Sequence, residues 1–182
     1  MIAGPLADPA SGVADVDRAL APRGLYVHSP PPGARFDVGA VHLDVLGPPR
    51  AYHGTRSDPN NSSLVLRATV HGVRILLPGD AEIEAQQAML GAGIDLRADV
   101  LKVPHHGSAY SDERFLAAVH ARVGVISVGA HNDYGHPSPR LLQLMARLGV
   151  PVRRTDRDGD VAVCGTPGHL TVSLHGVAAS TA

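Results

Sequence analysis

Aromatic residues and cysteine are scarce in this sequence. It contains no tryptophan, two phenylalanines and four tyrosines, so aromatic residues make up 3% of its 182 positions. Because 44% of the residues are nevertheless apolar, the core must be packed mainly from valine, leucine and alanine. The single cysteine, Cys164, excludes an internal disulfide and a cysteine-rich zinc site. Cys164 itself is predicted to be a small core residue on a strand.

The sequence also lacks an excess of charge and long apolar runs. Sixteen basic residues against seventeen acidic ones leave a formal net charge of -1, so any contact with nucleic acid must be local. No run approaches the roughly 18 apolar residues that span a bilayer, and the N-terminus lacks the layout of a secretory signal. We therefore expect a chain that is soluble as given and long enough to bury a real core.

Composition divides the chain into three parts. Residues 1–23 are rich in alanine, proline and glycine and predict a weakly ordered lead-in with a helix-compatible stretch at residues 13–20. The domain itself is expected at residues 24–176. Residues 177–182 are predicted to form a flexible tail.

Apolar periodicity predicts hairpins first and strand–helix alternation afterwards. A strand is expected at residues 25–28, and hairpins are expected from strands 35–38 with 41–46 and 63–70 with 73–78, separated by a polar loop at 50–62. Helices are predicted at 81–90, 112–120 and 139–148, and buried strands at 100–103 and 124–128. Short alternating strands are predicted at 150–154, 160–164 and 169–174, with a turn at Asp158-Gly159. Hairpins that lead into βα units favour a layered α/β domain.

Residues that bind metals or transfer protons follow the predicted buried strands. Asp80 precedes a helix and suits an N-cap, but Gly79 permits a close backbone approach, so Asp80 also suits a carboxylate that bridges two metal ions. His105 and His106 follow the next strand and offer imidazole nitrogens to a metal or a substrate phosphate. Adjacent side chains diverge, so only one of these two histidines is expected to be a ligand.

A third polar segment, residues 132–136, follows the strand at 124–128. His136 precedes a proline, which favours an extended backbone and predicts that its ring points outward from the fold. The alternative is a surface histidine in a turn. The other histidines have no ligand spacing and are predicted to be structural or solvated: His28, His42, His53, His71, His120, His131, His169 and His175.

Taken together, these segments resemble the metallo-β-lactamase-like domain at the C-terminus of the ComEC family of competence proteins. The resemblance rests on NNSSLVL at residues 60–66, ILLPGD at 75–80, LKVPHHGS at 101–108 and YGHP at 134–137. With RTDRDG at 154–159 it covers about residues 24–163. The His-His-Gly-Ser element is its most specific part.

The resemblance implies a four-layer αββα sandwich with a one- or two-metal centre between its halves. Asp80 resembles the bridging carboxylate, and His105 or His106 resembles the last histidine ligand, of a divalent metal such as zinc or manganese. The family's activity is metal-dependent hydrolysis, in which paired cations activate a water and clamp the reacting oxygens. The expected substrate is DNA, degraded at the membrane of a bacterium in a longer, membrane-associated protein.

The resemblance also suggests roles for residues around the metal. His136 joins Asp80, His105 and His106 as a candidate catalytic residue. The candidates for holding substrate phosphate or steadying the ligands are Lys102, Ser108, Asn132 and Tyr134.

The sequence departs from the family at one point. The family's first metal motif, His-x-x-x-Asp-His or His-x-His-x-Asp-His, has no counterpart here, so the chain resembles a C-terminal half-domain with an incomplete metal site. A separate N-terminal part, a late start site or a degenerate gene product would each explain this. The expected partners are DNA, the missing half-domain or membrane channel portion, and a second copy of the chain bound through an exposed apolar face.

Two other functions stay open at this point. A catalytically inactive α/β structural or interaction module would keep these residues as remnants, and the isolated chain would then bind no metal. A hydrolase of a small ester or lactone with the same fold is the further alternative.

Overall fold

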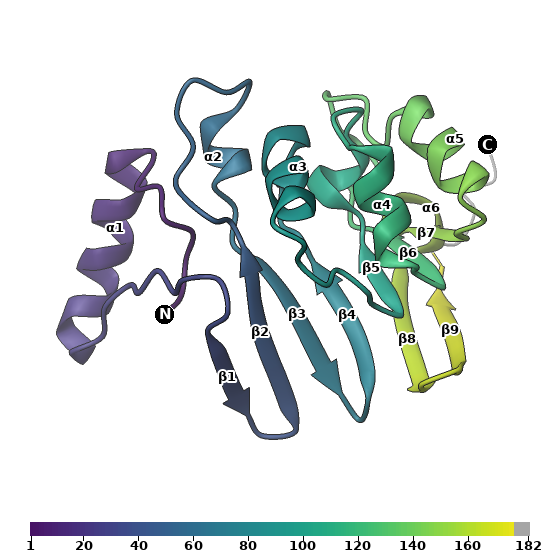
Figure 1. Ribbon diagram of the computed structural model, residues 1–182, viewed down its shortest axis with the longest axis horizontal. Helices are drawn as coiled ribbons and strands as arrows, with labels where there is room; N and C mark the ends of the chain where they lie inside the picture. The colour runs from purple at the N-terminus through teal and green to yellow at the C-terminus, as the bar shows by residue number, and fades with distance from the viewer. Residues whose placement is uncertain (177–182) are drawn as a thin grey trace.

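Strands β1 to β7 form one mixed sheet in the order of the sequence (Figure 1). The computed structural model describes residues 1–176; the tail expected at 177–182 lies outside the described residues. β1 to β4 are antiparallel, whereas β4 to β7 are parallel. Helices that follow β4, β5 and β6 lie over one face of the sheet, which confirms the predicted α/β class.

The two hairpins predicted in the first half are confirmed. They consist of β1 (Arg35–Val38) with β2 (Val41–Gly47), and β3 (Val65–Val70) with β4 (Val73–Leu77). The strand predicted at residues 25–28 is wrong, because this segment forms only an isolated bridge between Ile2 and His28. Three prolines follow it at residues 30–32, and proline has no N–H to donate to a strand ladder.

The predicted alternation of strands and helices in the second half is also confirmed. Its elements are α3 (Ile83–Gly91), β5 (Val100–Lys102), η2 (Pro104–Gly107), α4 (Glu113–Val119), β6 (Val123–Ile126), α5 (Pro139–Arg147) and β7 (Val152–Arg154). The main core lies between these helices and the sheet. It is aliphatic apart from Phe115 and Tyr52, and includes Leu76, Leu101 and Ile126 from the strands and Met89, Leu116 and Leu141 from the helices.

Four further helical elements lie outside this alternation. They are α1 (Ala10–Leu20), η1 (Ala21–Arg23), α2 (Asp58–Asn61) and α6 (Thr155–Asp158). α1 contains the helix-compatible stretch at residues 13–20, buries none of its residues and lies apart from α3, α4 and α5 (Figure 1). No helix within residues 1–176 is long and apolar enough to cross a bilayer.

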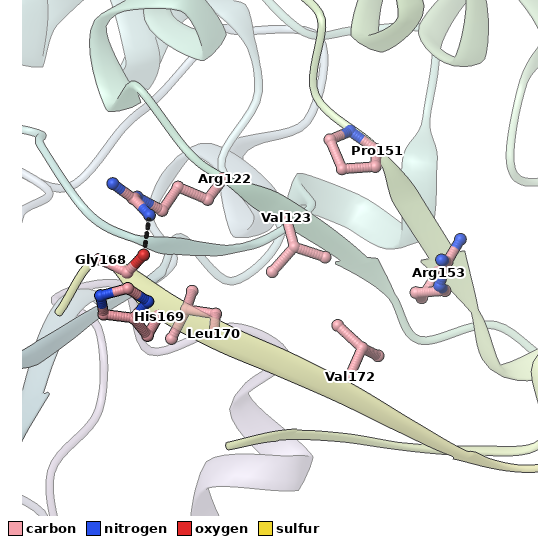
Figure 2. A pocket seen from close by; sticks show the side chains of 8 residues that line it. All are labelled: Arg122, Val123, Pro151, Arg153, Gly168, His169, Leu170 and Val172. Atoms are coloured by element: carbon pink, nitrogen blue, oxygen red, sulfur yellow. Dashed lines mark hydrogen bonds between the residues drawn. The ribbon is translucent and has the colours of Figure 1, made fainter. Parts of the chain in front are cut away.

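A hairpin of β8 (Asp160–Thr166) and β9 (His169–His175) covers part of the opposite face of the sheet. Leu170 and Val172 of β9 pack towards Val123 of β6, and Arg122 donates a hydrogen bond from Nη1 to the Gly168 carbonyl, 2.7 Å away (Figure 2). This hairpin therefore forms a second, smaller core with the sheet.

Cys164 of β8 is exposed, so its prediction as a core residue is wrong. Side chains alternate between the two sides of a strand. Its neighbour Val163 packs towards the sheet, which leaves Cys164 on the other side.

The sheet face under the hairpin continues as an apolar surface over β1 to β3. Strand pairing places two rows of apolar side chains across this face. Phe36, Leu43, Ala68 and Ile75 form one row, and Val38, Val41, Val70 and Val73 form the other. Among the described residues, the hairpin's core includes the β4 members of these rows but no residue of β1 to β3. Val38 is 65% exposed, whereas Phe36, Val41, Leu43 and Val70 are half-buried and Ala68 is buried. The alternate rows are polar, with Arg67 paired to Asp44 at 3.0 Å.

We expect this apolar surface to make the purified chain bind a hydrophobic dye and self-associate as its concentration rises, because exposed apolar patches promote association. The double substitution Val38→Lys/Leu43→Lys should weaken both effects while the circular dichroism spectrum is unchanged. Dye fluorescence and sedimentation velocity measure the two effects.

The matched control is Thr69→Lys, which adds a charge to the alternate, polar row of β3. It should leave dye binding and self-association unchanged. A chain that stays monomeric at high concentration and binds no dye contradicts the prediction.

Candidate functional site

The predicted site residues meet at one edge of the sheet. The carboxyl ends of β4, β5 and β6 lie at this edge because these strands are parallel. Asp80 follows β4, His105 and His106 lie in η2 after β5, and His136 lies in the loop after β6. The ring centroid of His105 lies 6.3 Å from that of His106 and 5.4 Å from that of His136. His106 Nε2 lies 3.7 Å from Asp80 Oδ1.

The position of Asp80 depends on a glycine. Gly79 has φ +57°, and a Cβ there would lie 2.9 Å from the Ser63 Cβ, so a side chain would push the two segments apart. The close approach lets the Asp80 N–H donate to Ser63 Oγ at 3.2 Å. The N-cap of α3 is Glu82, so the alternative interpretation of Asp80 as the N-cap is wrong.

The backbone of η2 is strained at both histidines. His105 and His106 have φ of +44° and +52°, in the left-handed region that costs a residue with a Cβ about 1–2 kcal/mol. The His105 N–H donates to the Gly79 carbonyl at 3.1 Å, which ties this turn to the loop that carries Asp80. Strain of this kind persists only where the surrounding structure enforces it, and it clusters at functional sites.

His106 is oriented towards Asp80. Its Nδ1 lies 2.6 Å from the Ser127 carbonyl, which can only accept, so Nδ1 carries the proton. In the neutral ring Nε2 then has a free lone pair on the side of Asp80. The separation of 3.7 Å is too long for a hydrogen bond but suits two donors that share a metal with bonds of about 2 Å.

His136 faces the cluster, which differs from the outward orientation predicted from Pro137. Gly107 accounts for the difference, because a Cβ there would lie 2.5 Å from the Pro137 Cβ, and its absence lets the loop pack onto η2. The His136 Nδ1 is buried and has no hydrogen-bond partner among the described residues. Burial, reinforced by His105 and His106, lowers the pKa of His136 and favours its neutral form.

The predicted substrate-binding residues differ in their accessibility. Tyr134 is 85% exposed and stacks on His136 with a ring separation of 6.0 Å. Asn132 braces the loop, because its side chain accepts from the His136 N–H and donates to the His136 carbonyl, both at 3.0 Å. Burial lowers the pKa of Lys102, and Asp80 partly offsets this effect. Ser108 is 1% exposed, and its Oγ accepts from the Tyr110 N–H at 3.3 Å.

Sequence reasoning missed Glu82, Arg56 and Tyr110. The Glu82 side chain is 1% exposed and lies beside His105. Burial opposes its ionisation, but hydrogen bonds from Arg56 and Asn60 outweigh this effect and hold the pKa of the carboxyl below its ordinary value. An acidic residue two positions after Asp80, between apolar neighbours, was the one signal that pointed to it.

The donors are of the types that bind divalent metals, but they are few. Within residues 1–176, no group of three or more His, Cys, Asp or Glu side chains is arranged to hold a metal ion. Asp80 and His106 converge as a pair. A catalytic zinc site has three protein ligands, so this pair fits part of such a set.

The fold and the site define an α/β protein with a histidine–aspartate cluster at the carboxyl edge of its parallel strands. No model of a known protein family matches the chain. The chain is 34% identical over 145 residues to ComE operon protein 3 of Bacillus subtilis, an alignment that covers 79% of this chain and 18% of that protein.

Two further relatives are similar to this chain. Competence protein ComA of Neisseria gonorrhoeae is 35% identical over 104 residues, 56% of this chain and 15% of that protein. Recombination protein 2 of Haemophilus influenzae is 33% identical over 127 residues, 68% of this chain and 15% of that protein. These homologues support a competence-protein family for the chain and a bacterial source. The chain spans less than a fifth of the length of each relative.

The close contact between η2 and the His136 loop predicts a large effect of Gly107→Ala. The added Cβ meets Pro137 and forces a φ of +87° on a residue that has a Cβ. We expect the free energy of unfolding to fall by about 2–4 kcal/mol, from backbone strain and overpacking together. Chemical denaturation measures this loss.

Gly93→Ala separates the two contributions. Gly93 has φ +67° and no atom within 4 Å of the added Cβ, so only the strain of about 1–2 kcal/mol should appear. Equal losses in the two variants would show that Gly107 is not needed for the packing of the His136 loop.

Proposed function

We propose that this chain is part of a metal-dependent hydrolase domain of a DNA-uptake protein, which cleaves phosphodiester bonds of DNA. The observation that carries the proposal is the pairing of Asp80 Oδ1 with His106 Nε2 at 3.7 Å, with His106 fixed by its bond to the Ser127 carbonyl. The competence proteins among the homologues support DNA uptake as the setting. Asp80 and His106 would hold the metal, zinc or manganese.

Each residue of the cluster has a task that its surroundings support. A divalent metal, when bound there, would lower the pKa of a water molecule. Ser127 keeps His106 in the tautomer that donates a lone pair. Burial lowers the pKa of His136 and favours a neutral ring beside His105. The exposed ring of Tyr134 suits stacking on a base of single-stranded DNA.

We propose further that residues outside this chain complete the metal site and the fold. Asp80 and His106 are two ligands where a catalytic site needs three. The partly exposed apolar rows of β1 to β3 suit a second sheet, as in an αββα sandwich. Relatives more than five times as long as the matched segment leave ample sequence for both.

A catalytically inactive interaction module is the second candidate function. The small number of described metal ligands favours it. The strained backbone at His105 and His106 favours the enzyme, because a relict turn would be free to relax to a cheaper conformation.

The proposal predicts that this chain alone has little Mn²⁺- or Zn²⁺-dependent nuclease activity, because two ligands bind metal weakly and activate water poorly. A chain extended by a segment with the missing His/Asp motif should cleave labelled single-stranded DNA. Asp80→Ala or His106→Gln should abolish this cleavage and lower Zn²⁺ affinity about tenfold or more in calorimetry.

His175→Gln is the matched control, because the His175 side chain is 93% exposed at the end of β9. It should retain the activity and the metal affinity of the extended chain. Robust metal-dependent cleavage by the 182-residue chain alone would refute the incomplete site. No cleavage by an extended chain that binds Zn²⁺ would favour the inactive module.

A further inference from the structure

Glu82 is a buried carboxylate whose neighbours are all hydrogen-bond donors. It precedes α3, but its side chain makes no capping bond to that helix. Arg56 donates from Nε to Oε2 at 3.0 Å and from Nη2 to Oε1 at 2.7 Å, and Asn60 donates from Nδ2 to Oε1 at 3.2 Å. A buried charge is stable only when it is paired and hydrogen-bonded in this way. The oxygens of Glu82 are therefore held in fixed positions.

Arg56 is itself held in place from a second side. Its Cζ lies 3.3 Å from the ring centroid of Tyr110, a close cation–π contact. The two-pronged contact with Glu82 and the ring beneath it leave the guanidinium little freedom. Because Arg56 is fixed, the carboxylate that it binds is fixed as well.

The third partner of the carboxylate is His105. The His105 Nδ1 lies 3.0 Å from Glu82 Oε1, and an ionised carboxylate only accepts, so Nδ1 carries the proton. Asn60 Nδ2 lies 3.4 Å from the same Nδ1, but two N–H donors cannot bond each other. The shorter contact, to a charged acceptor, decides the tautomer.

The two adjacent histidines are oriented in the same manner. His106 donates from Nδ1 to the Ser127 carbonyl, and His105 donates from Nδ1 to Glu82. In the neutral rings, both Nε2 atoms keep a lone pair. The ring of His105 meets the ring of His136 edge to face at 5.4 Å.

We propose that Glu82 is a positioning residue, which holds the His105 ring with its proton on Nδ1 and so presents the Nε2 lone pair to the histidine cluster. The use of that lone pair for metal or substrate rests on the proposed function. The orientation of the ring does not depend on it.

The test is the tautomer of His105, read from long-range ¹H–¹⁵N correlations of the labelled chain. In the unaltered chain we expect Nδ1 to carry the proton. In Glu82→Gln one oxygen becomes an N–H donor and the other loses its charge, so Arg56, Asn60 and His105 compete for one weaker acceptor. His105 should then shift towards the Nε2-protonated form, in which Nδ1 accepts from Asn60 Nδ2. If the proposed metal site also uses the His105 lone pair, Zn²⁺ affinity, measured on the same samples, should fall about tenfold or more, as when other groups that orient metal ligands are removed.

Glu84→Gln, in the first turn of α3, is the matched control. Glu84 accepts from Asn61 Nδ2 at 3.0 Å, and its substitution should leave the His105 tautomer and the Zn²⁺ affinity unchanged. If Glu82→Gln fails to fold by circular dichroism, Glu82→Asp replaces it, because the shorter carboxylate still binds Arg56 but retreats from His105. A smaller shift towards Nε2 protonation is then expected.

The outcomes separate this inference from the proposed function. An unchanged His105 tautomer in a folded Glu82 variant, or an equal shift in Glu84→Gln, would overturn the role of Glu82. A shifted tautomer in a chain that binds no Zn²⁺ would support the positioning by Glu82 and count against the metal site.

Discussion

The site depends on the hydrogen bond from the His105 N–H to the Gly79 carbonyl, which joins the loop after β4 to the turn after β5. Parallel pairing aligns Leu76 with Leu101 and so brings the two strand ends to the same level. The bond then fixes the distance between the Asp80 loop and the histidines. It also holds His105 in a left-handed conformation that an isolated turn would avoid. Without this bond, strand pairing would still bring the two loops to the same edge, but it would not fix the separation of Asp80 and His106.

The fold was largely predictable because its elements follow local periodicity. Alternating residues in β1 to β4 and the apolar stripe of α5 predict both the type and the approximate bounds of each element. The strand predicted at residues 25–28 does not form, because an apolar run does not specify a partner strand. The adjacent prolines cannot donate backbone hydrogen bonds, and the segment makes only a single bridge. Cys164 failed for a related reason. A hairpin that packs by one side exposes the alternate residues, and the sequence does not say which side is covered.

The meeting of the site residues was predictable from their position after successive strands, but their orientations were not. His136 turns inward because Gly107 has no side chain, which allows a close contact with Pro137, 30 positions further along the chain. Glu82 was missed because its partners, Arg56 and His105, lie 26 and 23 positions away. Neither contact leaves a local pattern. Ser108 belongs to the His-His-Gly-Ser element, yet its side chain is buried and its Oγ already accepts a hydrogen bond from the Tyr110 N–H.

The unequal coverage of the sheet bears on how the proposed site would be completed. Helices cover one face, whereas on the other face the hairpin core includes β4 to β6 but, among the described residues, none of β1 to β3. Burying apolar surface contributes about 25 cal/mol per Å², so a segment that covers the rows of β1 to β3 would gain free energy from contact alone. That gain would offset the cost of ordering new ligands beside Asp80 and His106. The rows lie towards the start of β4, whereas Asp80 follows its end. Only a covering domain that runs along the whole sheet would therefore complete the core and the metal site together and couple folding of the proposed whole domain to metal binding.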